Sequence, residues 1–191
     1  MGERLVLASG SPRRRELLSQ LGRPFDVVVP EVDEESRVDE SPGDLVRRLA
    51  LAKAEAVALS RPEAVVVGAD TIVVLDGQIM GKPIDTADAS RMLRLLSGRT
   101  HDVLTAVAVV PGECVTERTA VTFRDLTGAE IDRYVATGEP LDKAGAYGIQ
   151  GLGGDLVSFI EGSWDNVVGL PMDLVSPILV EILDSRAVDP Q

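Results

Sequence analysis

The sequence predicts an α/β fold, a mixed twisted sheet with flanking helices. An apolar run over residues 5–8 breaks at a turn of small residues and continues as a helix, with Ser11 as N-cap and Pro12 as the first helical residue. Apolar runs of strand length then alternate with segments whose apolar residues recur at helical spacing. Because Asp76-Gly77 is typical of a two-residue hairpin, the sheet should also contain antiparallel strands.

Composition limits the kind of protein that this chain can be. Its 191 residues suit one domain of ordinary size and contain no evident linker or repeat, so we expect a single domain over residues 1–191. The net charge of -12 disfavours general binding to nucleic acid or to anionic membranes. No run approaches the roughly 20 apolar residues of a membrane span, and the single cysteine, Cys114, excludes an intrachain disulfide. A cytoplasmic protein without nucleic-acid or membrane partners is expected.

The segment after the opening helix predicts a strand, an acidic loop and a second helix. The opening helix should span about ten residues and end at Gly22, and residues 25–29 should form a short buried strand. A loop with an acidic run that includes Glu34 follows. Ser41 then begins a helix whose apolar stripe does not include Lys53. The stripe comprises Leu45, Leu49, Ala52, Ala56 and Leu59.

The middle of the chain predicts two hairpins separated by a helix. An apolar strand over residues 64–67 runs into the small residues Gly68-Ala69, and residues 78–80 should pair back on its continuation. Thr86 should cap a third helix that ends at Ser97-Gly98. The second, longer hairpin comprises strands over residues 101–110 and 114–123.

The last third predicts a helix, a glycine-rich segment and a final helix. Thr127 and Glu130 form a capping box, and Gly138 should close the helix that it begins. Residues 143–154 contain five glycines within ten residues, which favours tight turns or a ligand close to the main chain. The other predicted elements are strands over 157–160 and 167–168, a final helix from Pro171 with a kink at Pro177 and a face of Leu174, Ile178 and Ile182, and a frayed polar tail over 184–191.

Three successive arginines, Arg13, Arg14 and Arg15, occupy the first turn of the opening helix. A helix N-terminus carries unpaired N–H groups and the positive end of the helix dipole, so cations there are unfavourable unless an anion neutralises them. This stretch therefore indicates a phosphate-binding site, and a solvated basic face is the alternative.

Carboxylates and further cations occur near the ends of the predicted strands, where α/β sheets place their ligands. Asp70 is the most informative, because it follows a buried strand, where a charge is costly without a partner; the alternative is that it caps a turn at Thr71. The others are Glu34, Lys53 and Lys82. Carboxylates beside a polyphosphate repel it, so the pattern implies a divalent cation, Mg²⁺ or Mn²⁺, held by one or two carboxylates and phosphate oxygens.

Four motifs in this order resemble those of the Maf family of nucleoside triphosphate pyrophosphatases, over nearly the full length of the chain. They are Ser9-Gly10-Ser11-Pro12-Arg13-Arg14, Gly68-Ala69-Asp70-Thr71, Gly81-Lys82-Pro83 and Ala146-Tyr147-Gly148-Ile149-Gln150-Gly151. The resemblance implies a mixed α/β fold similar to that of inosine triphosphatases, with an active-site cleft. It also implies a divalent metal, often a homodimer, and hydrolysis of a nucleoside triphosphate between its α and β phosphates.

The resemblance also implies roles for individual residues. Ser9, Arg13, Arg14, Lys53 and Lys82 would neutralise the triphosphate and the leaving pyrophosphate. Asp70 would be base or metal ligand, with Glu34 as the second carboxylate; the two roles conflict, unless Asp70 orients a water already acidified by the ion. Arg13, Thr71 and Gln150 match the subgroup that hydrolyses dTTP and UTP and differ from the branch acting on 7-methyl-GTP.

Other functions stay open at this point. Modified pyrimidine triphosphates are further candidate substrates, and removing them from the nucleotide pool is a candidate cellular role. A nucleotidyltransferase would share the opening strand, turn and arginines but needs an acceptor site, and its loop usually carries more glycines than the single Gly10. A nucleotide-binding regulator of cell division would bind without turnover.

Overall fold

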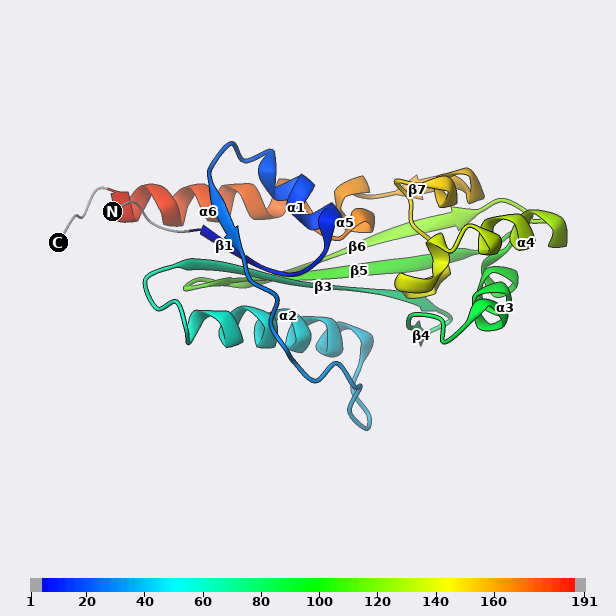
Figure 1. The fold of residues 1–191 in the computed structure, drawn as a ribbon, viewed down its shortest axis with the longest axis horizontal. Coiled ribbons are helices and arrows are strands. Elements are labelled where there is room, and N and C mark those ends of the chain that lie inside the picture. Colours follow the sequence, from blue (N-terminus) through cyan, green and yellow to red (C-terminus); the bar gives the residue numbers. More distant parts are fainter. Residues whose placement is uncertain (1–4, 188–191) are drawn as a thin grey trace. The chain divides into compact units, whose positions relative to one another are not determined.

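The computed structural model describes residues 5–187, and within that range the chain forms a seven-stranded mixed sheet with helices around it (Figure 1). Six strands follow the order β2-β1-β3-β5-β6-β7, and β4 pairs with β3. The strands are β1 (Leu5–Ala8), β2 (Phe25–Val27), β3 (Val65–Leu75), β4 (Gln78–Met80), β5 (Thr100–Val110), β6 (Cys114–Phe123) and β7 (Val157–Glu161). The predicted α/β class with a mixed sheet is confirmed.

Helices and short 3-10 turns connect the strands. The α-helices are α1 (Pro12–Ser19), α2 (Pro42–Ala58), α3 (Thr86–Leu96), α4 (Gly128–Ala136), α5 (Trp164–Val168) and α6 (Met172–Ala187). The 3-10 turns are η1 (Glu139–Asp142), η2 (Ala144–Ala146) and η3 (Leu152–Leu156). Among the described residues, none of these helices combines the length and the apolar character that a bilayer crossing requires.

The chain divides into two compact units, whose boundaries fall inside β3, β5 and β6 and directly after α5. The first unit comprises residues 1–70, 105–117 and 169–191, and the second comprises residues 71–104 and 118–168. A single domain over the whole chain stays a prediction.

In the first unit, β1 lies between β2 and β3 and is parallel to both, with Leu5 opposite Phe25 on one side and Val65 on the other. All four residues of β1 are buried. The predicted strand at residues 25–29 ends at Val27 and is half-buried rather than buried, because β2 lies at the edge of the sheet and has a neighbour on one side only.

Helix α2 packs closely on β3 at Gly68. A Cβ atom on Gly68 would lie 2.5 Å from the Ala50 carbonyl oxygen and 2.6 Å from the Ala54 nitrogen, so only glycine fits there. The chain passes through Gly68-Ala69-Asp70 as continuous strand, with Gly68 paired to Ala8 of β1, so Asp70 lies within β3 rather than after the predicted strand over residues 64–67. The predicted stripe on α2 is confirmed at Leu45 and Leu49 and wrong at Ala52, Ala56 and Leu59, which are not buried. The buried residues of α2 are Leu45, Val46, Leu49, Ala50, Ala54 and Val57.

The second unit confirms both the short hairpin and the capping box. Val73 pairs with Met80 in antiparallel β3 and β4. At the start of α4, the Thr127 side chain accepts the Glu130 N–H, and the Glu130 carboxylate accepts the Thr127 N–H. The N-cap of α3 is Asp85 rather than Thr86, since the Asp85 side chain accepts the Asp88 N–H.

The predicted strand at residues 167–168 is wrong, because these residues end α5. Two contacts with distant strands fix this helical turn: the buried Asn166 side chain donates to the Val103 carbonyl at 3.0 Å and to the Thr119 hydroxyl at 2.8 Å. Short apolar runs fit a strand or a helix equally well, so only these tertiary contacts select the helix.

Helix α6 begins at Met172 and contains Pro177. Its buried residues include Val175, Leu179 and Leu183 rather than the predicted face of Leu174, Ile178 and Ile182. The apolar residues of this helix spread over a broad face, so its periodicity does not specify which of them are buried. Residues 184–187 of the predicted frayed tail belong to the helix, and residues 188–191 lie outside the described range.

The core of the second unit contains His101, Phe123 and Tyr147 in mutual edge-to-face contact. His101 is 2% exposed, and its Nε2 lies 2.8 Å from the Tyr147 hydroxyl. Burial lowers the pKa of His101 from 6.5 to about 4. His101 is therefore a core residue whose imidazole is neutral at neutral pH.

This histidine should make stability depend on pH. Its pKa is lower in the folded than in the unfolded chain, so the unfolded chain binds the extra proton between pH 6.5 and about 4. As the pH is lowered through that interval, we expect the free energy of unfolding to fall by up to about 3 kcal/mol. Urea denaturation at several pH values, compared with His101→Gln, isolates this contribution because the chain has one histidine. Parallel pH profiles for the two proteins would contradict it.

Candidate active site

The turn between β1 and α1 is built around the hydroxyls of Ser9 and Ser11. The Ser11 side chain accepts the Arg14 N–H and begins α1 as predicted. Ser9, which is 7% exposed, accepts the Ser11 N–H at 3.2 Å and an Arg14 guanidinium N–H at 3.3 Å. The arginine-rich helix start is therefore ordered by its own side chains.

Arg14 is anchored inside the first unit rather than extended from it. Its Nε donates to the Gly169 carbonyl at 2.8 Å, a contact that no local sequence pattern marks. Burial lowers the pKa of Arg14, Asp70 opposes that shift, the charge of Arg13 adds to it, and Glu34 opposes it. Arg14 thus lies within the electrostatic reach of both predicted carboxylates.

Lys53 joins the two predicted carboxylates. Its Nζ lies 2.7 Å from Oδ1 of Asp70 and 2.6 Å from Oε1 of Glu34. The Lys53 and Asp70 side chains are each 12% exposed, whereas that of Glu34 is 51% exposed. The ammonium group therefore supplies the partner that a buried Asp70 requires. The sequence predicted these three residues individually, and the structure brings them together.

Asp70 and Glu34 fit a hard divalent cation. Both carboxylates converge on one positive charge, and oxygen atoms are the ligands that Mg²⁺ and Mn²⁺ prefer. Among the described residues, no group of three or more His, Cys, Asp or Glu side chains could hold a metal. A pair of carboxylates matches the way in which Mg²⁺ is bound, by one or two carboxylates together with substrate phosphates.

A second ion pair fixes the loop that carries Glu34. Arg48 donates from Nε and Nη2 to the two oxygens of Glu40, at 2.6 and 2.8 Å, and from Nη2 to the Glu35 carbonyl at 2.9 Å. Hydrogen bonding to Arg48 lowers the pKa of Glu40 to about 2. The sequence analysis missed this pair, because its members are eight residues apart and match no local motif.

The remaining predicted site residues differ in their surroundings. Arg13 is half-buried in the first turn of α1. In the second unit, Thr71 is half-buried in β3, whereas Lys82 is exposed in the loop after β4 and Gln150 is exposed between η2 and η3. The ligand contacts of all four stay predictions.

Gln150 lies in a loop that we call the glycine loop, residues 148–153. The tight turns expected around it are present: Gly145 and Ala146 have φ angles of 68° and 61°, η2 precedes the loop, and η3 begins within it at Leu152. A Cβ on Gly145 would lie 3.0 Å from the side chain of Val73, so close packing also requires glycine there.

Comparison with known proteins agrees with these motifs. The chain is 54% identical to the dTTP/UTP pyrophosphatase of Symbiobacterium thermophilum, over 94% of each chain. It is 58% identical to that of Moorella thermoacetica, over 92% of this chain and 93% of the relative. A solved nucleoside-triphosphatase / dITP/XTP pyrophosphatase from Mycobacterium abscessus aligns with a TM-score of 0.46 and 18% identity, over 94% of this chain and 97% of that one.

The family model described as Maf-like protein matches residues 4–182. That range contains all four sequence motifs and every element from β1 to most of α6. The chain therefore belongs to the Maf family.

Proposed function

We propose that this chain is a metal-dependent pyrophosphatase that hydrolyses dTTP and UTP to the monophosphate and pyrophosphate. The names of the relatives at 54% and 58% identity support this activity. The observation that carries it is the convergence of Asp70 and Glu34 on the Lys53 ammonium. Such a site suits a nucleoside triphosphate with a bound cation, because the Lys53 ammonium can meet the negative phosphates and the two carboxylates can meet the cation.

We assign the binding of the triphosphate to the helix start and the nearby cations. The N-terminus of α1 offers backbone N–H groups, and Ser9, Arg13 and Arg14 belong to the same turn. Lys53 and Lys82 would add positive charge as negative charge grows on the leaving pyrophosphate. We assign recognition of the base to Gln150 and Thr71.

Asp70 and Glu34 are the residues that would hold Mg²⁺ or Mn²⁺. When bound, the cation supplies positive charge that offsets the charge of the phosphates. In hydrolysis, a water oxygen forms a bond to the α-phosphorus, and the bond from that phosphorus to the bridging oxygen breaks. Asp70 would orient this water and accept its proton, for which a weak base suffices if the water is already acidified by a bound cation. Lys53 would hold the Asp70 carboxylate in position.

Separation of the reaction products tests the proposed function. We expect purified protein with Mg²⁺ to release the monophosphate and pyrophosphate from dTTP and UTP, without a second substrate. A nucleoside diphosphate with orthophosphate would contradict cleavage between the α and β phosphates. Tight binding without turnover would instead favour a regulator, and dependence on an acceptor a nucleotidyltransferase.

The same panel should include modified pyrimidine triphosphates and be repeated with Mn²⁺ and with a chelator. Loss of turnover in the chelator is expected, because the triphosphate would then meet the two carboxylates without a cation between them. The expected homodimer, the cytoplasmic location and the absence of nucleic-acid and membrane partners stay predictions.

A further inference from the structure

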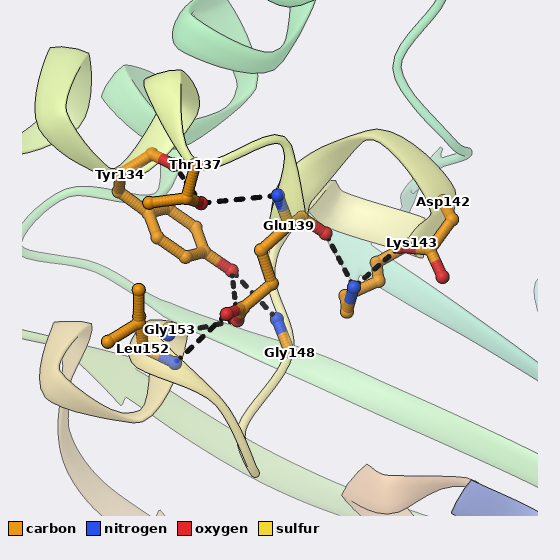
Figure 2. A network of polar contacts seen from close by, with 8 residues as sticks. All are labelled: Tyr134, Thr137, Glu139, Asp142, Lys143, Gly148, Leu152 and Gly153. Atoms are coloured by element: carbon orange, nitrogen blue, oxygen red, sulfur yellow. Dashed lines mark hydrogen bonds and ion pairs between the residues drawn. The ribbon is translucent and has the colours of Figure 1, made fainter. Parts of the chain in front are cut away.

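The carboxylate of Glu139 accepts hydrogen bonds from three donors (Figure 2). The Tyr134 hydroxyl donates to Oε1 at 2.9 Å, the Gly153 N–H to Oε1 at 3.2 Å, and the Leu152 N–H to Oε2 at 3.1 Å. The oxygen of Tyr134 in turn accepts the Gly148 N–H at 3.1 Å. Two side chains from outside the glycine loop therefore hold both of its ends.

These contacts replace the local stabilisation that the glycine loop lacks. Gly151, the N-cap of η3, has no side chain to cap the turn, so the Leu152 and Gly153 N–H groups depend on Glu139. A Cβ on Gly151 would lie 2.5 Å from the Glu139 oxygens, and one on Gly153 would lie 2.6 Å from the Tyr134 oxygen. The loop is thus packed directly on its two anchors, which offsets the entropy cost of its glycines.

Glu139 is itself held in place. Gly138, with a φ of 76°, ends α4, and the Glu139 N–H then donates to the Thr137 hydroxyl at 3.2 Å. The Lys143 ammonium donates to the Glu139 carbonyl, as Figure 2 shows. Burial alone would raise the pKa of Glu139, but the hydrogen bonds from the loop and from Tyr134 outweigh it and lower the pKa. The anchor is therefore a charged carboxylate at neutral pH.

Gln150 lies exposed between the two anchored ends of the glycine loop. A glutamine amide can rotate to match the O4 and N3–H of thymine and uracil or the reversed pattern of cytosine. Gln150 alone therefore cannot reject cytosine, and selection needs neighbouring groups that do not move. A loop whose ends are fixed by a charged side chain provides such groups.

We propose that Glu139 is a positioning residue for base selection, which together with Tyr134 fixes the glycine loop so that Gln150 and the loop backbone distinguish thymine and uracil from cytosine. This inference rests on the proposed function, since it assigns the glycine loop to the base of the substrate. It adds two residues, neither of which belongs to the four motifs, to the determinants of specificity.

Glu139→Gln tests the proposal, because an amide has the same size but only one accepting oxygen. Its NH₂ group must face one of the three donors, so at least one loop contact is lost. We expect kcat/KM for dTTP and UTP to fall about tenfold, mainly through KM, while that for CTP changes little. The inhibition constant of pyrophosphate, which has no base, should stay unchanged.

Two further variants complete the test. Tyr134→Phe removes the link to Gly148 and should shift the dTTP-to-CTP ratio in the same direction, even where Glu139→Gln folds poorly. Asp132→Asn is the matched control, because it also replaces a carboxylate with an amide. Asp132 lies on α4, its side chain is 70% exposed, and it faces Arg94. It should leave the ratio as in the unmodified chain.

Three results would overturn the inference. A dTTP-to-CTP ratio unchanged in both Glu139→Gln and Tyr134→Phe would make the pair a structural anchor only, as would equal losses for all three nucleotides and for pyrophosphate. If the unmodified chain hydrolyses neither dTTP nor UTP, the proposed function is wrong and the inference falls with it. The unmodified chain, measured first, separates these failures.

Discussion

Asp70→Asn should lower kcat for dTTP and UTP about a hundredfold or more. The amide keeps the size of the side chain and can still accept a hydrogen bond from Lys53, so the fold should persist. It carries no charge, however, and can neither take a proton from water nor act as a strong ligand for a cation. Steady-state kinetics across a Mg²⁺ titration, with circular dichroism to confirm folding, measure the effect.

Asp26→Asn is the matched control for this substitution. Asp26 belongs to the same unit but lies on the edge strand β2, where its half-exposed side chain contacts Arg61. We expect the kcat of this variant to equal that of the unmodified chain, because Arg61, the ion-pair partner of Asp26, has no role in the proposed site. Near-normal turnover of Asp70→Asn at saturating Mg²⁺ would show that Asp70 is neither base nor metal ligand.

Gly68→Ala should reduce both stability and activity. The added methyl group would meet the backbone of α2 at Ala50 and Ala54, and backbone atoms cannot move aside as the end of a side chain can. Such overpacking costs about 1–3 kcal/mol of unfolding free energy. Because Lys53 precedes Ala54, a displaced helix would also move the Lys53 ammonium from Asp70, and we expect kcat to fall about tenfold or more.

Gly43→Ala is the control for the glycine substitution. Gly43 lies in the first turn of the same helix, and a Cβ there would have only the Ser41 hydroxyl nearby, at 4.0 Å. Alanine favours the helix, so we expect unchanged activity and a gain of up to about 1 kcal/mol. Urea denaturation of both variants and of the unmodified chain measures their free energies of unfolding. Equal stability of Gly68→Ala and the unmodified chain would mean that α2 tolerates the methyl group without strain.

Local sequence patterns determined the parts of this protein that depend on a few neighbouring residues. Ser11 with Pro12, the turn at Asp76-Gly77 and the capping box at Thr127 each satisfy backbone groups within their own segment, so they form as predicted. The individual candidate residues, including Asp70 and Glu34, could also be recognised in the sequence, because the chemistry of carboxylates and cations near a phosphate is independent of the fold.

Only the tertiary structure decided the features that depend on contacts between distant segments. Residue 68 must be glycine because α2 lies against β3 at that point. Residues 167–168 are helical because the Asn166 side chain reaches β5 and β6. The link from Lys53 to both carboxylates, and that from Glu139 to the glycine loop, join side chains whose spacing in the sequence follows no period. Burial and hydrogen bonding at these positions depend on the packing of the whole chain, so a local sequence pattern cannot predict them.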